Sequence, residues 1–171
     1  HQIALRRIAG VARRRPAAGI PVPSMSNPHP LIIRKAAVLG AGVMGAQIAA
    51  HLVNCGVAVV LFDLPAKEGD PDGIVRKALA GLAKLEPAPF AAKDLAAQVD
   101  VANYGRDLGE LAECDLVIEA IAEGLVWERD LYEKVAPHLR GVAIVASNTS
   151  GLSLAALAAA IERHLSGAEL S

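Results

Sequence analysis

The chain has no acidic residue in its first third and few aromatic residues anywhere. No Asp or Glu precedes Asp63, although seven Lys and Arg do, so the formal charge of −1 divides into a basic start and an acidic remainder. An acidic body excludes a nucleic-acid-binding surface there, because such surfaces are basic. With only 3% aromatic residues, the core depends on Ala, Val and Leu, which is typical of helices packed on a parallel sheet.

Cysteines are also scarce, and long apolar runs are missing. Cys55 and Cys114 match no metal-binding or redox spacing, so we expect no metal site and two small buried thiols in a reducing cytoplasm. No apolar run is long enough for a membrane span, since Gly, Asn, Asp and Pro interrupt each one. From its length we expect one domain with a sizeable core.

The most informative stretch present is the glycine run Gly40-Ala41-Gly42-Val43-Met44-Gly45. A short apolar run over 35–39 precedes it and suits a buried strand, and a helix-forming stretch over 46–53 follows it. A second apolar strand over 57–62 ends at Asp63. A glycine motif alone is weak evidence, but strand, glycine turn, helix, strand and acid in this order predict a dinucleotide-binding unit.

The spacing of the glycines has a chemical reason. Gly40 permits the tight turn out of the strand, Gly42 has no side chain to block a pyrophosphate, and Gly45 lets the helix pack closely on the sheet. The pyrophosphate would then meet free backbone N–H groups at the positive end of the helix dipole. Val43 and Met44 complete the predicted cofactor-binding run. The alternative is a glycine turn that binds nothing.

Asp63 lies 18 residues after Gly45, where a carboxylate can accept hydrogen bonds from both hydroxyls of an adenosine ribose. The same carboxylate repels a 2′-phosphate. We therefore expect NAD as the cofactor in preference to NADP.

Residues 1–30 differ from the body of the chain because they are rich in Arg and Pro and contain no acid. We expect a disordered or non-native leader, with Met25-Ser26-Asn27 as a natural start that leaves residues 1–24 upstream. A mitochondrial transit peptide is one alternative. A basic arm that binds a membrane or a partner is another.

The body, residues 31–171, alternates strand and helix and predicts an α/β fold, a Rossmann-like doubly wound parallel sheet with helices on both faces. Further strands are expected over 99–101, 115–121 and 142–146. Further helices are expected over 74–85, 91–98, 108–114, 126–139 and 154–165.

Two polar blocks follow predicted strands, at the edge where ligands of such sheets bind. The first is Glu119-Ala120-Ile121-Ala122-Glu123 and the second is Ser147-Asn148-Thr149-Ser150. Short polar side chains there can contact the distal half of a dinucleotide. Helix capping by Ser150 or Ser153, and compensation of a helix dipole by Glu123, are equally simple explanations.

Three blocks, residues 38–49, 115–123 and 146–153, together resemble the NAD-binding domain of 3-hydroxyacyl-CoA dehydrogenases. The segment 61–69 and the long connection after it are more similar to large bacterial enzymes that join this domain to an enoyl-CoA hydratase. The resemblance covers about residues 31–171. It implies NAD as cofactor, a 3-hydroxyacyl-CoA as substrate, and a place in fatty-acid β-oxidation. It also implies the cytoplasm of a bacterium as the location, in preference to the mitochondrial matrix.

The resemblance also implies a role for each site residue. The three glycines receive the pyrophosphate and Asp63 the adenosine ribose, while Ala122 and Glu123 lie on the nicotinamide side. Asn148 and Ser150 lie near the nicotinamide and the substrate oxygen, and the Ser150 hydroxyl forms a hydrogen bond with the reacting group.

The sequence departs from the family in two ways. Glu128 stands where the family often has a basic residue, although Arg129 is adjacent. The family's general base, a His in a Gly-x-His-Phe-Phe-Asn-Pro strand, has no counterpart among the histidines here, which are His1, His29, His51, His138 and His164. We therefore expect a fragment that is incomplete at its C-terminus and inactive alone, whose missing partners are a catalytic His/Glu pair and a C-terminal helical domain.

Three other functions remain open from the sequence. The chain could be a non-catalytic NAD-binding module, a dehydrogenase of another β-hydroxyacid, or a purely structural Rossmann-like domain. The parent protein could form a homo-oligomer. We expect no nucleic-acid partner.

Overall fold

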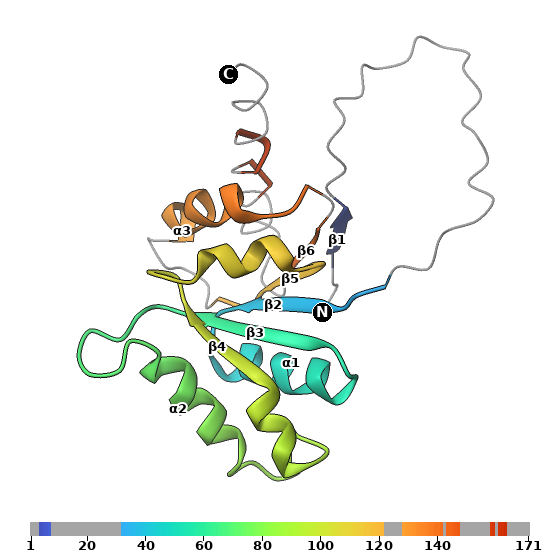
Figure 1. The fold of residues 1–171 in the computed structure, drawn as a ribbon, viewed down its shortest axis with the longest axis vertical. Coiled ribbons are helices and arrows are strands. Elements are labelled where there is room, and N and C mark those ends of the chain that lie inside the picture. Colours follow the sequence, from blue (N-terminus) through green and yellow to red (C-terminus); the bar gives the residue numbers. More distant parts are fainter. Residues whose placement is uncertain are drawn as a thin grey trace, which may run out of the picture.

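A computed structural model describes residues 4–7, 32–121, 128–141, 143–147, 158–159 and 161–163. Within them the chain forms a six-stranded sheet of order β1-β6-β5-β2-β3-β4 (Figure 1). The strands are β1 (Ala4–Arg7), β2 (Lys35–Leu39), β3 (Ala58–Asp63), β4 (Val99–Asn103), β5 (Leu116–Glu119) and β6 (Ile144–Ser147). Strands β2 to β6 are parallel, which confirms the predicted Rossmann-like sheet.

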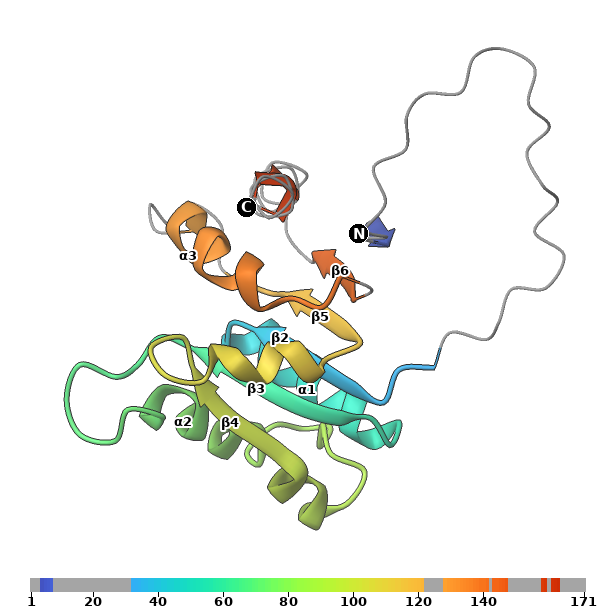
Figure 2. The same ribbon diagram turned by 45° about the horizontal axis from the view of Figure 1, so that its top comes forward.

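Helices cover both faces of this sheet. The α-helices are α1 (Val43–Asn54), α2 (Gly73–Leu82) and α3 (Glu128–Val135), and the short 3-10 helices are η1 (Lys93–Gln98), η2 (Leu108–Glu113) and η3 (Ala136–His138). Figures 1 and 2 show α1 and α2 on one face and α3 on the other. The chain is thus wound in both directions from β2, and its carboxyl strand ends share one edge.

The core consists of one apolar layer on each face. Alternate residues of a strand point to opposite faces, so Val38 joins the layer under α1 whereas Leu39 joins the layer under α3. In α1 the buried stripe is mostly small, and its members are Gly45, Ala46, Ala49, Ala50 and Val53. These small side chains let α1 lie close to the sheet, which brings its N-terminus to the ends of the strands.

Several predicted elements differ in type or extent. The helices predicted over 91–98 and 108–114 are 3-10 helices over 93–98 and 108–113, and η1 buries none of its residues. Strand β5 spans Leu116–Glu119, which is shorter than the predicted 115–121, although the Ala120 N–H still donates to the carbonyl of Leu39 at 2.8 Å. The predicted helix 154–165 lies largely outside the described residues, where 158–159 and 161–163 are helical.

The two cysteines have different surroundings. Cys114 is fully buried, as expected, and burial raises the pKa of its thiol to about 11. The prediction for Cys55 was wrong, since its thiol is exposed at the C-terminal end of α1, one position past the helix. The sequence pattern of a helix predicts poorly which residue at its end is still buried. One step along the helix rotates the side chain by more than a quarter of a turn.

The described part of the leader contains a strand that the sequence did not predict. Strand β1 pairs antiparallel with β6, with Leu5 opposite Ala146. The remainder of the predicted leader lies outside the described residues. Among the helices that are described, none has the length and apolar character of a membrane span.

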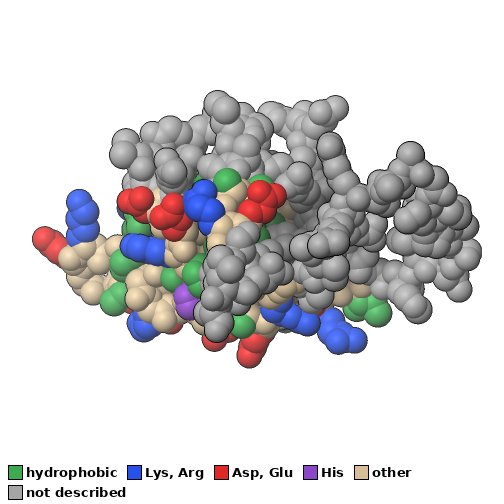
Figure 3. All heavy atoms as spheres, turned by 90° about the horizontal axis from the view of Figure 1, so that it is seen from above, with side chains coloured by type: hydrophobic (Ala, Val, Ile, Leu, Met, Phe, Trp, Pro, Cys, Tyr) green, Lys and Arg blue, Asp and Glu red, His purple; other side chains and the backbone are tan. Residues whose placement is uncertain are grey.

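Charged side chains are mixed on the surface. In the view from above, acidic and basic side chains lie beside one another over the described part, with hydrophobic side chains between them (Figure 3). One such group lies at the amino end of β2, where Lys35 pairs with Glu110 and Glu113 of η2, both at 2.8 Å. These ion pairs lie at the edge of the sheet opposite the strand ends that carry the candidate site.

Candidate functional site

The glycine run leaves β2 at the carboxyl edge of the sheet and requires glycine at two positions. Gly40 has φ +104°, and a Cβ on it would lie 2.8 Å from the carbonyl oxygen of Ala120. A Cβ on Gly45 would overlap the carbonyl oxygen of Gly40. The tight turn and the close packing of the following helix, both predicted from the spacing, are therefore present.

Gly42 differs from its two neighbours because the space beside it is open. A Cβ on Gly42 would meet no described atom within 4 Å. Gly42 is the N-cap of α1, and this end of the helix has neither a side-chain cap nor an acidic residue in its first turn. The first amides of a helix have no intrahelical acceptor, so this end presents N–H groups and a positive dipole to an anion.

Val43 and Met44 form the first turn of α1 and are unusually exposed for apolar side chains. Val43 is 81% exposed and Met44 is 54% exposed. Since isolated exposed apolar residues are common, this exposure alone assigns no role. Their place in the cofactor-binding run remains a prediction.

Asp63 ends β3 beside the glycine run and is tied to it by hydrogen bonds. Its Oδ2 accepts from the Ala41 N–H at 2.7 Å, and its Oδ1 accepts from the Leu64 N–H at 2.7 Å. An ionised carboxylate has about four lone-pair sites, so each oxygen keeps capacity for a ribose hydroxyl. The open helix end and this fixed carboxylate suit the phosphate and the ribose of a dinucleotide.

Four predicted site residues lie outside the described residues: Ala122, Glu123, Asn148 and Ser150. The structure does describe the strands that lead to them. Strands β5 and β6 are neighbours, with Glu119 opposite Ser147 in the register. The two polar blocks therefore start side by side at the same edge as the glycine run, and their roles remain predictions.

Sequence reasoning missed a buried hydrogen-bonded pair at this edge. Glu119 is 1% exposed, and its Oε2 accepts from the Ser147 hydroxyl at 2.6 Å. Its Oε1 accepts from the Ile121 N–H at 2.8 Å. A signal was present, because Glu119 ends an apolar strand just as Asp63 does. Its carboxylate ties the ends of β5 and β6 together.

Tyr104 follows β4 and reaches beneath the same edge. Its ring stacks on Phe62, with centroids 5.9 Å apart. Burial raises the pKa of the Tyr104 hydroxyl, and the nearby carboxylates of Asp63 and Glu119 add to the effect. Among the described residues this hydroxyl makes no hydrogen bond of good geometry, although the nearby backbone of Gly40 offsets part of the rise in its pKa. A buried polar group without a partner costs stability.

The Tyr104→Phe variant is therefore expected to be more stable than the natural chain. It removes the buried hydroxyl and keeps the ring stacked on Phe62, so the free energy of unfolding should rise by about 1 kcal/mol and Tm by about 2–4 °C. Thermal unfolding followed by circular dichroism measures this. A fall in Tm would show instead that the hydroxyl is hydrogen-bonded in solution.

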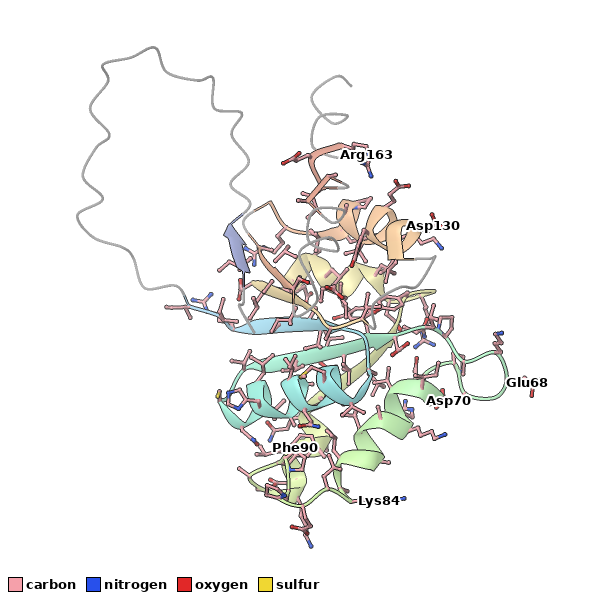
Figure 4. The ribbon with its side chains drawn as sticks, turned by 180° about the vertical axis from the view of Figure 1, so that it is seen from behind. Glu68, Asp70, Lys84, Phe90, Asp130 and Arg163 are labelled. Carbon is pink, nitrogen blue, oxygen red and sulfur yellow. The ribbon has the colours of Figure 1, made fainter. Side chains whose placement is uncertain are left out.

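A second polar cluster fixes the connection that follows Asp63. Asp72, 7% exposed, accepts from Asn103 Nδ2 at 2.7 Å and from Arg106 Nη2 at 3.1 Å. The Asn103 hydrogen bond holds the pKa of Asp72 below its ordinary value of 3.8, and Arg106 lowers it further. Figure 4 shows Glu68 at the outer tip of this connection and Asp70 nearer to α2. The cluster therefore anchors the loop that begins beside the candidate ribose site.

The Asp72→Asn variant is expected to lose stability at neutral pH and to lose part of its acid sensitivity. A carboxylate with a lowered folded-state pKa stabilises the protein above its unfolded pKa, and this contribution disappears as the pH falls through the folded pKa. At pH 7 the free energy of unfolding should fall by about 1–3 kcal/mol. Between about pH 5 and pH 2 the variant's stability should change less than that of the natural chain.

Thermal unfolding across this pH range measures both effects. The control is Asp100→Asn, which changes an exposed aspartate on β4 and should leave the stability and its pH dependence unchanged. Equal pH dependence in the natural chain and in Asp72→Asn would contradict the role assigned to the cluster.

Comparison with known proteins agrees with this geometry. Residues 35–167 match the family described as the NAD-binding domain of 3-hydroxyacyl-CoA dehydrogenase. The chain belongs to this family. NAD is thus the cofactor of the family to which the domain belongs, as predicted.

Curated relatives are considerably longer than the chain. A putative fatty acid oxidation complex trifunctional enzyme of Rickettsia felis is 44% identical over 123 residues, which cover 71% of this chain and 17% of the relative. A probable 3-hydroxyacyl-CoA dehydrogenase of Deinococcus radiodurans is 44% identical over 124 residues, or 71% of this chain and 36% of the relative. The domain therefore spans between about a sixth and about a third of these proteins.

A solved structure shows the same fold. The (S)-3-hydroxybutyryl-CoA dehydrogenase of Ralstonia eutropha is 29% identical, with a TM-score of 0.60, over 78% of this chain and 47% of that one. The domain thus shares its architecture with a dehydrogenase.

Proposed function

We propose that this domain is the NAD-binding half of a 3-hydroxyacyl-CoA dehydrogenase that acts in fatty-acid oxidation. The observation that carries the proposal is the open N-terminus of α1 at Gly42 with the Asp63 carboxylate fixed beside it. Relatives named as fatty acid oxidation enzymes support the substrate class. The proposed setting is the cytoplasm of a bacterium, in keeping with these bacterial relatives.

In this proposal the residues of the domain bind and orient, and NAD supplies the hydride acceptor when bound. The amides of the first turn of α1 hold the pyrophosphate, and Asp63 accepts the ribose hydroxyls. Glu123 lies on the nicotinamide side. Asn148 and Ser150, which follow β6, face the substrate oxygen, where the Ser150 hydroxyl donates to the reacting group.

Removal of the hydroxyl proton during hydride transfer requires a base, and a positioned base contributes about 10²–10⁴-fold to the rate. The sequence contains no histidine in the family's motif for this base. We therefore propose that the isolated chain binds NAD and turns over little or no substrate, and that a helical domain completes the site in the parent protein. Rapid NADH formation at 340 nm from 3-hydroxyacyl-CoA by the isolated chain would overturn this.

The Asp63→Asn variant tests the proposed ribose contact. Loss of a charged acceptor for two hydroxyls should weaken NAD binding by about 10- to 100-fold. NADP binding should change little or improve, because the repulsion of the 2′-phosphate disappears. Isothermal titration with each nucleotide measures both constants. An equal loss of affinity for NAD and for NADP would indicate that Asp63 only supports the loop, through its hydrogen bond with Ala41.

A further inference from the structure

The sheet order indicates where the second half of the dinucleotide extends. Asp63, the candidate adenosine-ribose acceptor, ends β3 on one side of β2, and β5 followed by β6 lies on the other side. A cofactor whose pyrophosphate lies at the glycine run after β2 must therefore place its nicotinamide half over the ends of β5 and β6. This step rests on the proposed function.

Glu119 is the charged group that the fold buries at this position. It is the last residue of β5, and both of its carboxyl oxygens accept hydrogen bonds, from Ser147 and from the backbone of Ile121. Both oxygens are thereby fixed in position, and a glutamate side chain ordinarily carries a negative charge at neutral pH. A fixed negative charge is thus buried beneath the predicted nicotinamide half.

We propose that the Glu119 carboxylate is a positioning residue that favours the oxidised cofactor over the reduced one. The nicotinamide ring carries a positive charge in NAD⁺ and none in NADH. A charge in the protein interior is weakly screened by solvent and salt, and Ser147 and Ile121 already hold this one in place. Its attraction therefore stabilises bound NAD⁺ selectively, and needs no direct contact with the ring.

A purely structural role makes a different prediction. If Glu119 only joins the ends of β5 and β6, its loss should weaken the binding of NAD⁺ and of NADH equally. The ratio of the two dissociation constants separates the two roles, because only a charge effect changes it. The Glu119→Gln variant removes the charge with little change in shape, since an amide can accept from Ile121 and donate to the Ser147 hydroxyl.

The experiment is a titration of the folded chain with NAD⁺ and with NADH, by calorimetry and by NADH fluorescence. In Glu119→Gln we expect the ratio Kd(NAD⁺)/Kd(NADH) to rise about three- to tenfold, the size expected for one charge in a partly polar interior. Glu119→Asp, which draws the charge back by one carbon, should raise the ratio by about twofold and provides a second measurement if Glu119→Gln does not fold.

Two controls complete the design. Glu113→Gln makes the same substitution at the amino end of the sheet, beside Lys35, and should leave the ratio unchanged. Ser147→Ala removes one hydrogen bond to Glu119 and keeps the charge. It should therefore weaken the binding of both nucleotides by the same factor and leave the ratio unchanged. If the ratio is unchanged in the Glu119 variants, the role proposed for Glu119 is wrong but the proposed function still stands. If the natural chain binds neither nucleotide, the proposed function itself is wrong.

Discussion

Replacing Gly45 by alanine is expected to destabilise the domain by about 3 kcal/mol or more and to abolish NAD binding. The new Cβ would overlap the carbonyl oxygen of Gly40, which is backbone and cannot rotate away. Gly40 itself lies against the backbone of Ala120, so the turn cannot retreat in that direction. Helix α1 must therefore move off the sheet, and the buried contacts of Ala46 and Ala49 move with it.

Chemical unfolding measures this loss, and the chain provides a matched control. Gly81→Ala makes the same substitution inside α2, where a Cβ meets no described atom within 4 Å. That variant should be more stable by up to about 1 kcal/mol, because alanine favours a helix. A Gly45→Ala variant as stable as the natural chain would show that α1 does not depend on this close approach.

Replacing Gly42 by alanine is expected to weaken NAD binding by about 30-fold or more with little effect on folding. The backbone at Gly42 has φ −68°, which any residue adopts, and the space beside it is open. The alanine Cβ would enter the space where the phosphates meet the first amides of α1. Loss of glycine at an N-cap should cost less than about 1 kcal/mol of stability.

Titration calorimetry and thermal unfolding of the same sample test the two halves of this prediction. Gly109→Ala is the control, since it adds a Cβ in open space on η2 at a distance from the glycine run. It should change neither quantity. Unchanged NAD affinity in a folded Gly42→Ala variant would show that the anion does not bind at this helix end.

The two glycine variants separate binding from folding within one motif. Gly45 contacts the protein's own backbone, whereas Gly42 faces open space. The residue type is the same at both positions, so only the surroundings decide the outcome. The pair of results would therefore show which part of the glycine run holds the fold and which part is free to hold a ligand.

Local patterns predicted much of the fold and the first half of the site. The alternation of strand and helix predicted the parallel sheet. It could be recognised because apolar runs and glycine turns determine local structure within a few neighbouring residues. The glycine run and Asp63 were found because their spacing is fixed by one strand–helix–strand unit. Their hydrogen bond through Ala41, at 2.7 Å, joins two residues of that same unit.

Contacts between distant segments could not be predicted in the same way. The Glu119–Ser147 hydrogen bond depends on the register of β5 against β6, and the Asp72–Asn103 bond joins a loop to the end of β4. Neither partner identifies the other in the sequence. The same holds for Cys55, whose exposure depends on where the end of α1 lies relative to its neighbours.

Polar groups at the strand ends are buried or half-buried, which sets stability against binding. Asp63 and Glu119 place two carboxylates near the buried hydroxyl of Tyr104. Burying such polar groups costs stability even where they are hydrogen-bonded. Functional sites often retain groups of this kind.

The most direct test of the account is an NMR titration of the ¹⁵N-labelled chain with NAD⁺. The largest amide shifts should occur at Gly42, Val43, Met44 and Gly45, at the N-terminal end of α1, together with Leu64 beside the Asp63 carboxylate. Saturable shifts confined to these residues and to the ends of β5 and β6 would support a dinucleotide held across the strand ends. Unchanged amides at Gly42 to Gly45 at saturating NAD⁺ would contradict it.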